Sequence, residues 1–125
     1  MKEIIATSNA PAAIGPYSQA TKVGGTLYIS GQLPIDPATG AFAADDIAGQ
    51  TEQSLKNIGA ILTQAGYDYA DVVKTTVLLA NISDFGAMNG VYAKFFTENC
   101  PARAAFAVKD LPKGALVEIE AVAAR

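Results

Sequence analysis

Residues 45–80 read DDIAGQTEQSLKNIGAILTQAGYDYADVVKTTVLLA and carry the clearest structural pattern in the chain. Apolar residues recur at helical spacing between Asp45-Asp46, which can cap a helix, and Gly66, which can end one. From Asp71 to Ala80 the sequence becomes β-branched and apolar, as is typical of a strand. These residues therefore predict a helix followed by a strand. The recurring apolar positions are Ile47, Leu55, Ile58 and Leu62.

The segment before this stretch predicts a β-hairpin. Ala20–Val23 and Thr26–Ser30 flank Gly24-Gly25, a pair that tolerates the positive φ angles of a tight two-residue turn. Further upstream, residues 10–17 hold two prolines and one glycine, which predicts a loop or an extended arm.

The segment after it predicts a second helix and two more strands. Ser83 or Asp84 can cap the helix, and the strands are expected at Ala104–Lys109 and Leu116–Ala123. Hairpin, helix, strand, helix and two strands in this order predict an α+β fold, with both helices on one face of the sheet. The second helix is expected to bury Phe85, Met88, Tyr92 and Phe95.

Size and charge narrow the classes of function. A chain of 125 residues and 12.9 kDa predicts a single domain that spans residues 1–125. Nine basic and twelve acidic residues give a net charge of −3, which argues against a nucleic-acid partner bound through phosphates. The chain has no apolar run that resembles a secretion signal or a membrane span, so we expect a cytoplasmic protein without a membrane partner.

The residue types that are missing exclude much chemistry. Without histidine the chain cannot build a Ser-His-Asp triad, a Cys-His dyad or an imidazole metal site. Cys100 is the one cysteine, so an intrachain disulfide is impossible, and we expect no metal centre. Cys100 precedes a proline and has no base to activate it, which favours a buried or idle thiol over a nucleophile. Catalysis would have to use arginine, carboxylates, hydroxyls, amides, lysine, tyrosine or the backbone.

The second face of the predicted sheet has no cover. Residues 104–108 are apolar on both faces of their strand, and two helices can cover only one side of a sheet. Self-association would cover the other side, and an open amphipathic face is the alternative.

Arg103 is one of only two arginines and lies where a loop leads into an apolar strand. A guanidinium there could bind a carboxylate or phosphate through two hydrogen bonds, or it could pair with a structural carboxylate. Residues alone leave both interpretations open. Arg125 is the last residue, and we expect it to be a solvated tail.

Glu118 and Glu120 lie two residues apart on the last strand, so both project from the same face. They share that face with Leu116 and Val122, where one carboxylate could be partly desolvated and act as a base toward water. A polar, solvent-bathed strand face is the simpler alternative.

Four further residues have weaker signals. Ser30 and Gly31 end a strand, where a hydroxyl and backbone N–H groups could meet a ligand or simply form a turn. Tyr17 could stack on a ligand or line an interface. The pattern alone marks Asn89 only as a solvated helix residue.

Four segments read APAAIGPYSQ (10–19), SGQLP (30–34), PAR (101–103) and LPKGALVEIEA (111–121). Together they resemble the RidA/YjgF family, the reactive intermediate deaminases. The resemblance implies a chorismate-mutase-like α+β fold and a homotrimer with ligand clefts between subunits. It also implies hydrolysis of enamines and imines, such as 2-aminoacrylate, to 2-oxo acids and ammonia, without a metal or organic cofactor. These substrates escape from pyridoxal-phosphate enzymes.

The resemblance also implies roles for individual residues. Arg103 falls on the family position that holds the substrate carboxylate, and Glu118 falls on the position that activates or orients water. The positions expected to contact the small-molecule ligand, an imine, an enamine or a 2-oxo acid, are Tyr17, Ser30, Gly31 and Asn89.

The chain departs from the family pattern at one place. Where many members read Pro-Ala-Arg-Ser-Cys, residues 101–105 read PARAA, so Ala105 replaces the family cysteine and Cys100 does not align with it. Hydrolysis needs a carboxylate clamp and an oriented water rather than a thiol, so we expect activity to survive and thiol-dependent regulation to be absent.

Three functions are compatible with these observations. The first is an imine and enamine deaminase. The second is a non-catalytic trimer that binds metabolites and regulates partners, for which Arg103 would serve equally well but Glu118 would not be needed. The third is an endoribonuclease, an activity attributed to some relatives, against which the net charge of −3 and the lack of histidine count.

Overall fold

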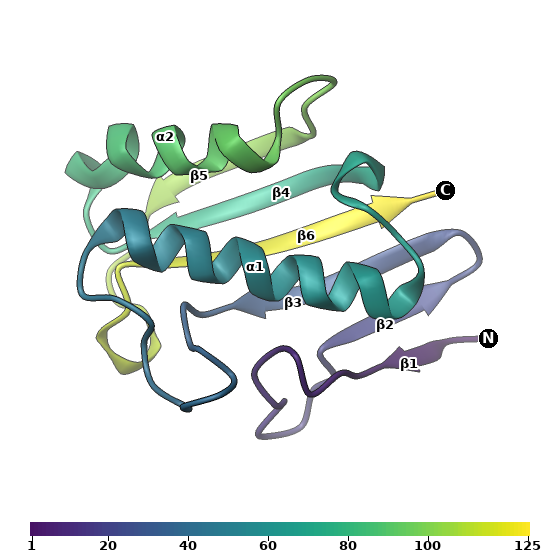
Figure 1. Cartoon of the computed structure of the whole chain (residues 1–125). Helices are drawn as coiled ribbons and strands as arrows, with labels where there is room; N and C mark the ends of the chain where they lie inside the picture. The colour runs from purple at the N-terminus through teal and green to yellow at the C-terminus, as the bar shows by residue number, and fades with distance from the viewer.

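The computed structural model describes residues 1–125 and contains one six-stranded sheet and two α-helices (Figure 1). The strand order in the sheet is β1-β2-β3-β6-β4-β5. This arrangement confirms the predicted α+β class. The elements are β1 (Glu3–Ile5), β2 (Ala20–Val23), β3 (Thr26–Gln32), α1 (Ile47–Ala65), β4 (Val72–Leu79), α2 (Phe85–Phe95), β5 (Ala102–Ala107) and β6 (Val117–Ala124).

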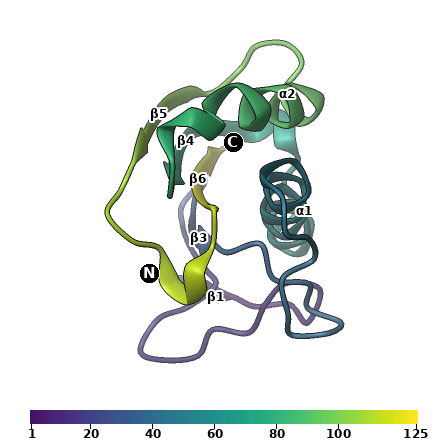
Figure 2. The ribbon, with the colours of Figure 1, turned by 90° about the vertical axis from the view of Figure 1, so that its left-hand side faces the viewer.

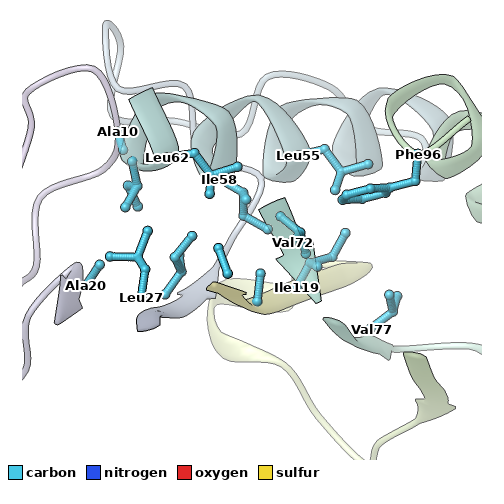
Figure 3. Close-up of a cluster of buried hydrophobic side chains, with 14 of the residues drawn as sticks. Ala10, Ala20, Leu27, Leu55, Ile58, Leu62, Val72, Val77, Phe96 and Ile119 are labelled. Carbon is cyan, nitrogen blue, oxygen red and sulfur yellow. The ribbon is translucent and has the colours of Figure 1, made fainter. Parts of the chain in front are cut away.

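Both helices lie on one face of the sheet, as the sequence predicts (Figure 2). The apolar side of α1 packs on the central strands, where Ile58 lies above Leu27 of β3 and Ile119 of β6 (Figure 3). These side chains are almost fully excluded from solvent and form the hydrophobic core. No helix of the chain is both long and apolar enough to cross a membrane.

Helix α1 begins and ends where the sequence predicts. The side chain of Asp46 accepts a hydrogen bond from the Gly49 N–H, which satisfies one of the free donors of the first turn. Gly66 has a φ of 82° and ends the helix in the left-handed conformation that glycine adopts without strain.

Helix α2 differs from the expectation in its cap and its buried side. A 3₁₀ turn over Ile82–Asp84 leads into it, so Asp84 already has helical angles and its side chain makes no capping hydrogen bond. Met88 and Tyr92 are buried as predicted, whereas Phe85 and Phe95 are only half-buried.

Strands β4 and β5 are parallel, with α2 as the crossover between them. Strand β5 begins two residues earlier than the sequence pattern predicts, because backbone pairing with β4 extends to Ala102. Arg103 therefore lies within an edge strand rather than in the loop before it. The sequence pattern does not predict β1, a three-residue strand that depends on pairing with β2.

Arg125 is exposed to solvent, as expected, but it is not a free tail. Its guanidinium forms a 3.1 Å ion pair with Asp71 and donates to the Gly66 carbonyl at 2.8 Å. Its backbone N–H donates to the Gly25 carbonyl. These contacts hold the end of β6 against the hairpin turn and the end of α1.

Candidate functional site

The six candidate residues form two groups on opposite faces of the sheet. Glu118, Ser30, Gly31 and Tyr17 line one cavity of about 630 Å³. Arg103 and Asn89 line another of about 510 Å³, on the helix side. The two groups are not brought together within one chain.

Strand β6 places Glu118 on the open face of the sheet. Alternate residues Val117, Ile119 and Ala121 are buried beneath α1, so the residues between them face the opposite way. Glu118 is half-buried there, whereas Glu120 is exposed. The predicted shared face of the two glutamates is confirmed.

A bulge in β3 places Gly31 against this carboxylate, and Ser30 lines the same cavity. Ile29 pairs with Ala121 and Gln32 with Ile119, so two residues of β3 oppose Glu120 alone. A Cβ atom on Gly31 would overlap the carboxylate of Glu118. Glycine at this position therefore lets the backbone approach Glu118 closely.

Gln19, which the sequence analysis did not single out, holds the arm that carries Tyr17. It is buried, accepts a hydrogen bond from the Thr7 N–H at 2.7 Å and donates to the Pro11 carbonyl at 2.7 Å. The Ser30 hydroxyl donates to the Ser18 carbonyl at 2.6 Å. These bonds fix the arm beside the β3 bulge, while the Tyr17 ring stays exposed at the cavity.

The environment of Glu118 makes its carboxylate more basic. Burial raises the pKa of Glu118 above its ordinary value, and the negative charge of Glu120 raises the pKa further. A carboxylate with a raised pKa accepts a proton from water more readily than an ordinary glutamate does.

Arg103 points to the helix side, where α2 holds it. It pairs in register with the buried Thr75 of β4, and one terminal nitrogen donates to Asn89 Oδ1 at 2.7 Å. The guanidinium carbon lies 4.8 Å from the centre of the Tyr92 ring and 5.5 Å from that of Phe85.

The guanidinium of Arg103 has no carboxylate partner in the chain, since the one ion pair joins Arg125 and Asp71. The structure therefore removes the alternative of a structural ion pair within the chain. Four of the five guanidinium N–H donors remain for a ligand after the bond to Asn89.

The sequence pattern assigned no function to Asn89, and it missed Tyr92 as a neighbour of Arg103. Phe85, Asn89 and Tyr92 follow one another at spacings of four and three residues, which places them on one face of α2. The sequence shows this spacing, but it does not show that this face of α2 packs against Arg103 of β5. Cys100 lines the same cavity and its thiol donates to the Phe96 carbonyl.

The cavity around Glu118 also contains Lys113, which the sequence analysis did not select. Lys113 has a φ of 60°, a strained angle for a residue with a side chain. The chain holds no group of three or more His, Cys, Asp or Glu residues that could bind a metal ion.

Comparisons with known proteins agree over nearly the whole chain. The family model described as endoribonuclease L-PSP matches residues 7–125. Human 2-iminobutanoate/2-iminopropanoate deaminase is 53% identical over 98% of this chain and 90% of its own length. RidA from an Antarctic Psychrobacter bacterium superposes with a TM-score of 0.95 at 48% identity, covering 98% of this chain and 99% of that one. The structure of E. coli TdcF with bound serine has a TM-score of 0.94 at 42% identity and covers 98% of both chains.

Proposed function

Since the chain belongs to the RidA/YjgF family, we propose that it hydrolyses small imines and enamines, such as 2-aminoacrylate, to 2-oxo acids and ammonia. The human relative is named for this activity on 2-iminobutanoate and 2-iminopropanoate. The observation that carries the proposal is the half-buried Glu118, whose raised pKa suits a base, together with the unpaired guanidinium of Arg103. A site with these two groups can bind a carboxylate and activate water.

The chemistry follows from the groups available. Arg103 binds the substrate carboxylate through two hydrogen bonds and so orients the adjacent C=N group. An enamine first takes a proton at its terminal carbon and becomes the protonated imine. Glu118 accepts a proton from a water molecule as the water oxygen adds to the imine carbon, which gives a neutral amino alcohol. The nitrogen then takes this proton back from Glu118, and the C–N bond breaks as the hydroxyl group loses its proton to solvent, which releases ammonia and leaves the 2-oxo acid. No metal or organic cofactor enters this scheme.

We place the complete site between two subunits of a homotrimer. One subunit contributes Asn89 and Arg103. The neighbouring subunit contributes Glu118 and the other residues of the Glu118 cavity. The separation of the two groups onto opposite faces supports this arrangement, because neither face alone holds both Arg103 and Glu118. The exposed apolar side chains of the open sheet face, among them Tyr28 and Phe106, would be buried between subunits.

Light scattering at micromolar protein concentration should therefore give a mass of three times 12.9 kDa. The side chains of Tyr28 and Phe106 on the open face would otherwise stay exposed to solvent. A stable monomer in this measurement would contradict both the interface and the shared site.

A trimer that only binds metabolites is the alternative. The serine bound to TdcF shows that this relative holds an α-amino acid, which is compatible with either function. Glu118 favours hydrolysis, because binding an anionic ligand gains nothing from a second negative charge. The net charge of −3 argues against RNA as a substrate. We expect the protein to act in the cytoplasm.

A coupled assay separates these functions. A dehydratase generates 2-aminoacrylate in the presence of the protein, and the release of ammonia and pyruvate is followed over time. We expect release faster than spontaneous hydrolysis and proportional to the amount of protein. Release at the spontaneous rate, with a 2-oxo acid still bound in titration calorimetry, would favour the binding module instead.

The pH profile of turnover should depend on Glu120. Glu118 must be ionised to act as a base, so turnover should fall as the pH drops through its raised pKa. Glu120→Gln removes the second cause of the shift, so the acid side of the profile should move to lower pH. The pKa of Glu118 should still lie above its ordinary value of 4.5 in this variant, because burial, the larger cause of the shift, remains.

Glu52→Gln is the matched control, because it removes one exposed carboxylate on α1 that does not line the cavity. This variant should leave the profile unchanged. If the fall in turnover at low pH occurs at the same pH in Glu120→Gln as in the unaltered protein, a group other than Glu118 controls the proton transfer.

A further inference from the structure

Tyr92 of α2 contacts both strands of the parallel pair at once. Thr75 of β4 and Arg103 of β5 are neighbours in register, and both face α2. The phenolic oxygen of Tyr92 and the hydroxyl of Thr75 share a buried hydrogen bond of 2.7 Å. The Tyr92 ring lies under the guanidinium of Arg103, with 4.8 Å from ring centre to guanidinium carbon.

The ring itself has little freedom to move. Its hydroxyl is held by Thr75, and the Phe96 ring packs against it with a centroid distance of 4.7 Å. Burial raises the pKa of Tyr92, so the phenol stays neutral at physiological pH and presents an uncharged ring to the cation.

Arg103, by contrast, would be mobile without this support. It lies on an edge strand and is exposed, and an arginine side chain has many rotamers to lose when it binds a ligand. A planar guanidinium that rests on a fixed ring and donates to Asn89 already has its orientation set before a ligand arrives.

We propose that Tyr92, fixed by Thr75, is a positioning residue that sets the plane of the Arg103 guanidinium for binding the substrate carboxylate. The inference rests on the proposed function, in which Arg103 is the carboxylate clamp. Tyr92 acts through Arg103 and takes no part in proton transfer. Its removal should raise KM and weaken 2-oxo acid binding more than it lowers kcat.

The test compares Tyr92→Leu, which loses the ring, with Tyr92→Phe, which keeps it. Titration with 2-oxobutanoate should show about tenfold weaker binding for Tyr92→Leu, the range of a partly desolvated cation–π contact, and near-normal binding for Tyr92→Phe. Tyr67→Leu is the matched control, since the buried Tyr67 ring lies 5.7 Å from the guanidinium of Arg125 and does not pack on Arg103. It should bind 2-oxobutanoate like the unaltered protein.

Combining Tyr92→Leu with Arg103→Ala separates positioning from general destabilisation. If Tyr92 acts only through Arg103, the residual kcat/KM of Arg103→Ala should not fall further in the double variant. A further fall of about tenfold, or normal binding by Tyr92→Leu alone, would overturn the inference. If Tyr92→Leu does not fold, Thr75→Val is tested in its place. We expect this variant to bind 2-oxobutanoate about threefold more weakly. Unchanged binding by Thr75→Val would contradict the proposal.

Arg103→Ala alone tells the two proposals apart. If it loses 2-oxobutanoate while Tyr92→Leu binds normally, only the positioning role fails. If Arg103→Ala itself binds 2-oxobutanoate normally, the clamp in the proposed function is wrong, and the role of Tyr92 is overturned with it.

Discussion

Arg103→Ala is expected to abolish nearly all turnover of 2-aminoacrylate, and Arg103→Lys to lose most of it. The guanidinium can meet both carboxylate oxygens at once while it lies over the Tyr92 ring, whereas an ammonium is a single point of charge. Losing charge-assisted hydrogen bonds of about 1.5–3 kcal/mol each should weaken 2-oxo acid binding at least about tenfold. Turnover assays and titration calorimetry on both variants measure these effects.

Arg125→Lys is the matched control for Arg103→Lys. Arg125 is the other arginine of the chain and is tied to Asp71 and Gly66, so this change should spare turnover. If a folded Arg103→Ala trimer binds 2-oxo acids and turns over 2-aminoacrylate normally, Arg103 does not bind the substrate carboxylate.

Glu118→Gln should lower turnover by about 10²- to 10⁴-fold, the usual contribution of a general base. Glutamine has the shape of glutamate and fits the same space beside Gly31, so the cavity and the binding of a 2-oxo acid should survive. The expected result is therefore a large fall in kcat with little change in the affinity for 2-oxo acids. Steady-state kinetics and titration calorimetry on the same preparation would separate the two quantities.

Glu120→Gln tests the assignment within the pair of glutamates. Glu120 is exposed and acts on Glu118 only through its charge, so this variant should keep most of its turnover at neutral pH. An inactive Glu120→Gln beside a fully active Glu118→Gln would mean that the base is Glu120.

The parts of the fold that depend on local chemistry could be predicted from the sequence. Helix α1 has a capping side chain in Asp46 and a left-handed Gly66, and both ends of the helix agree with the prediction. The start of β5 and the existence of β1 depend on pairing with strands far away in the chain, and both were missed. The contacts of Arg125 likewise join the chain end to residues that no local pattern connects with it.

The candidate site divides in the same way. The alternation along β6 was enough to place Glu118 and Glu120 on one face of the sheet. The resemblance was needed to select Asn89. The bond of Asn89 to Arg103 and the stack on Tyr92 depend on how α2 packs over β5. The reason for glycine at position 31 appears only when the bulge brings it against Glu118.

The most direct test of a shared hydrolytic site mixes subunits of Arg103→Ala with subunits of Glu118→Gln. Each variant alone should be nearly inactive. A mixed trimer contains one interface where an intact Arg103 faces an intact Glu118, so equal mixing should restore about a quarter of the turnover of the unaltered protein. Mixed trimers that form but remain as inactive as their parents would show that Arg103 and Glu118 do not act together across the interface.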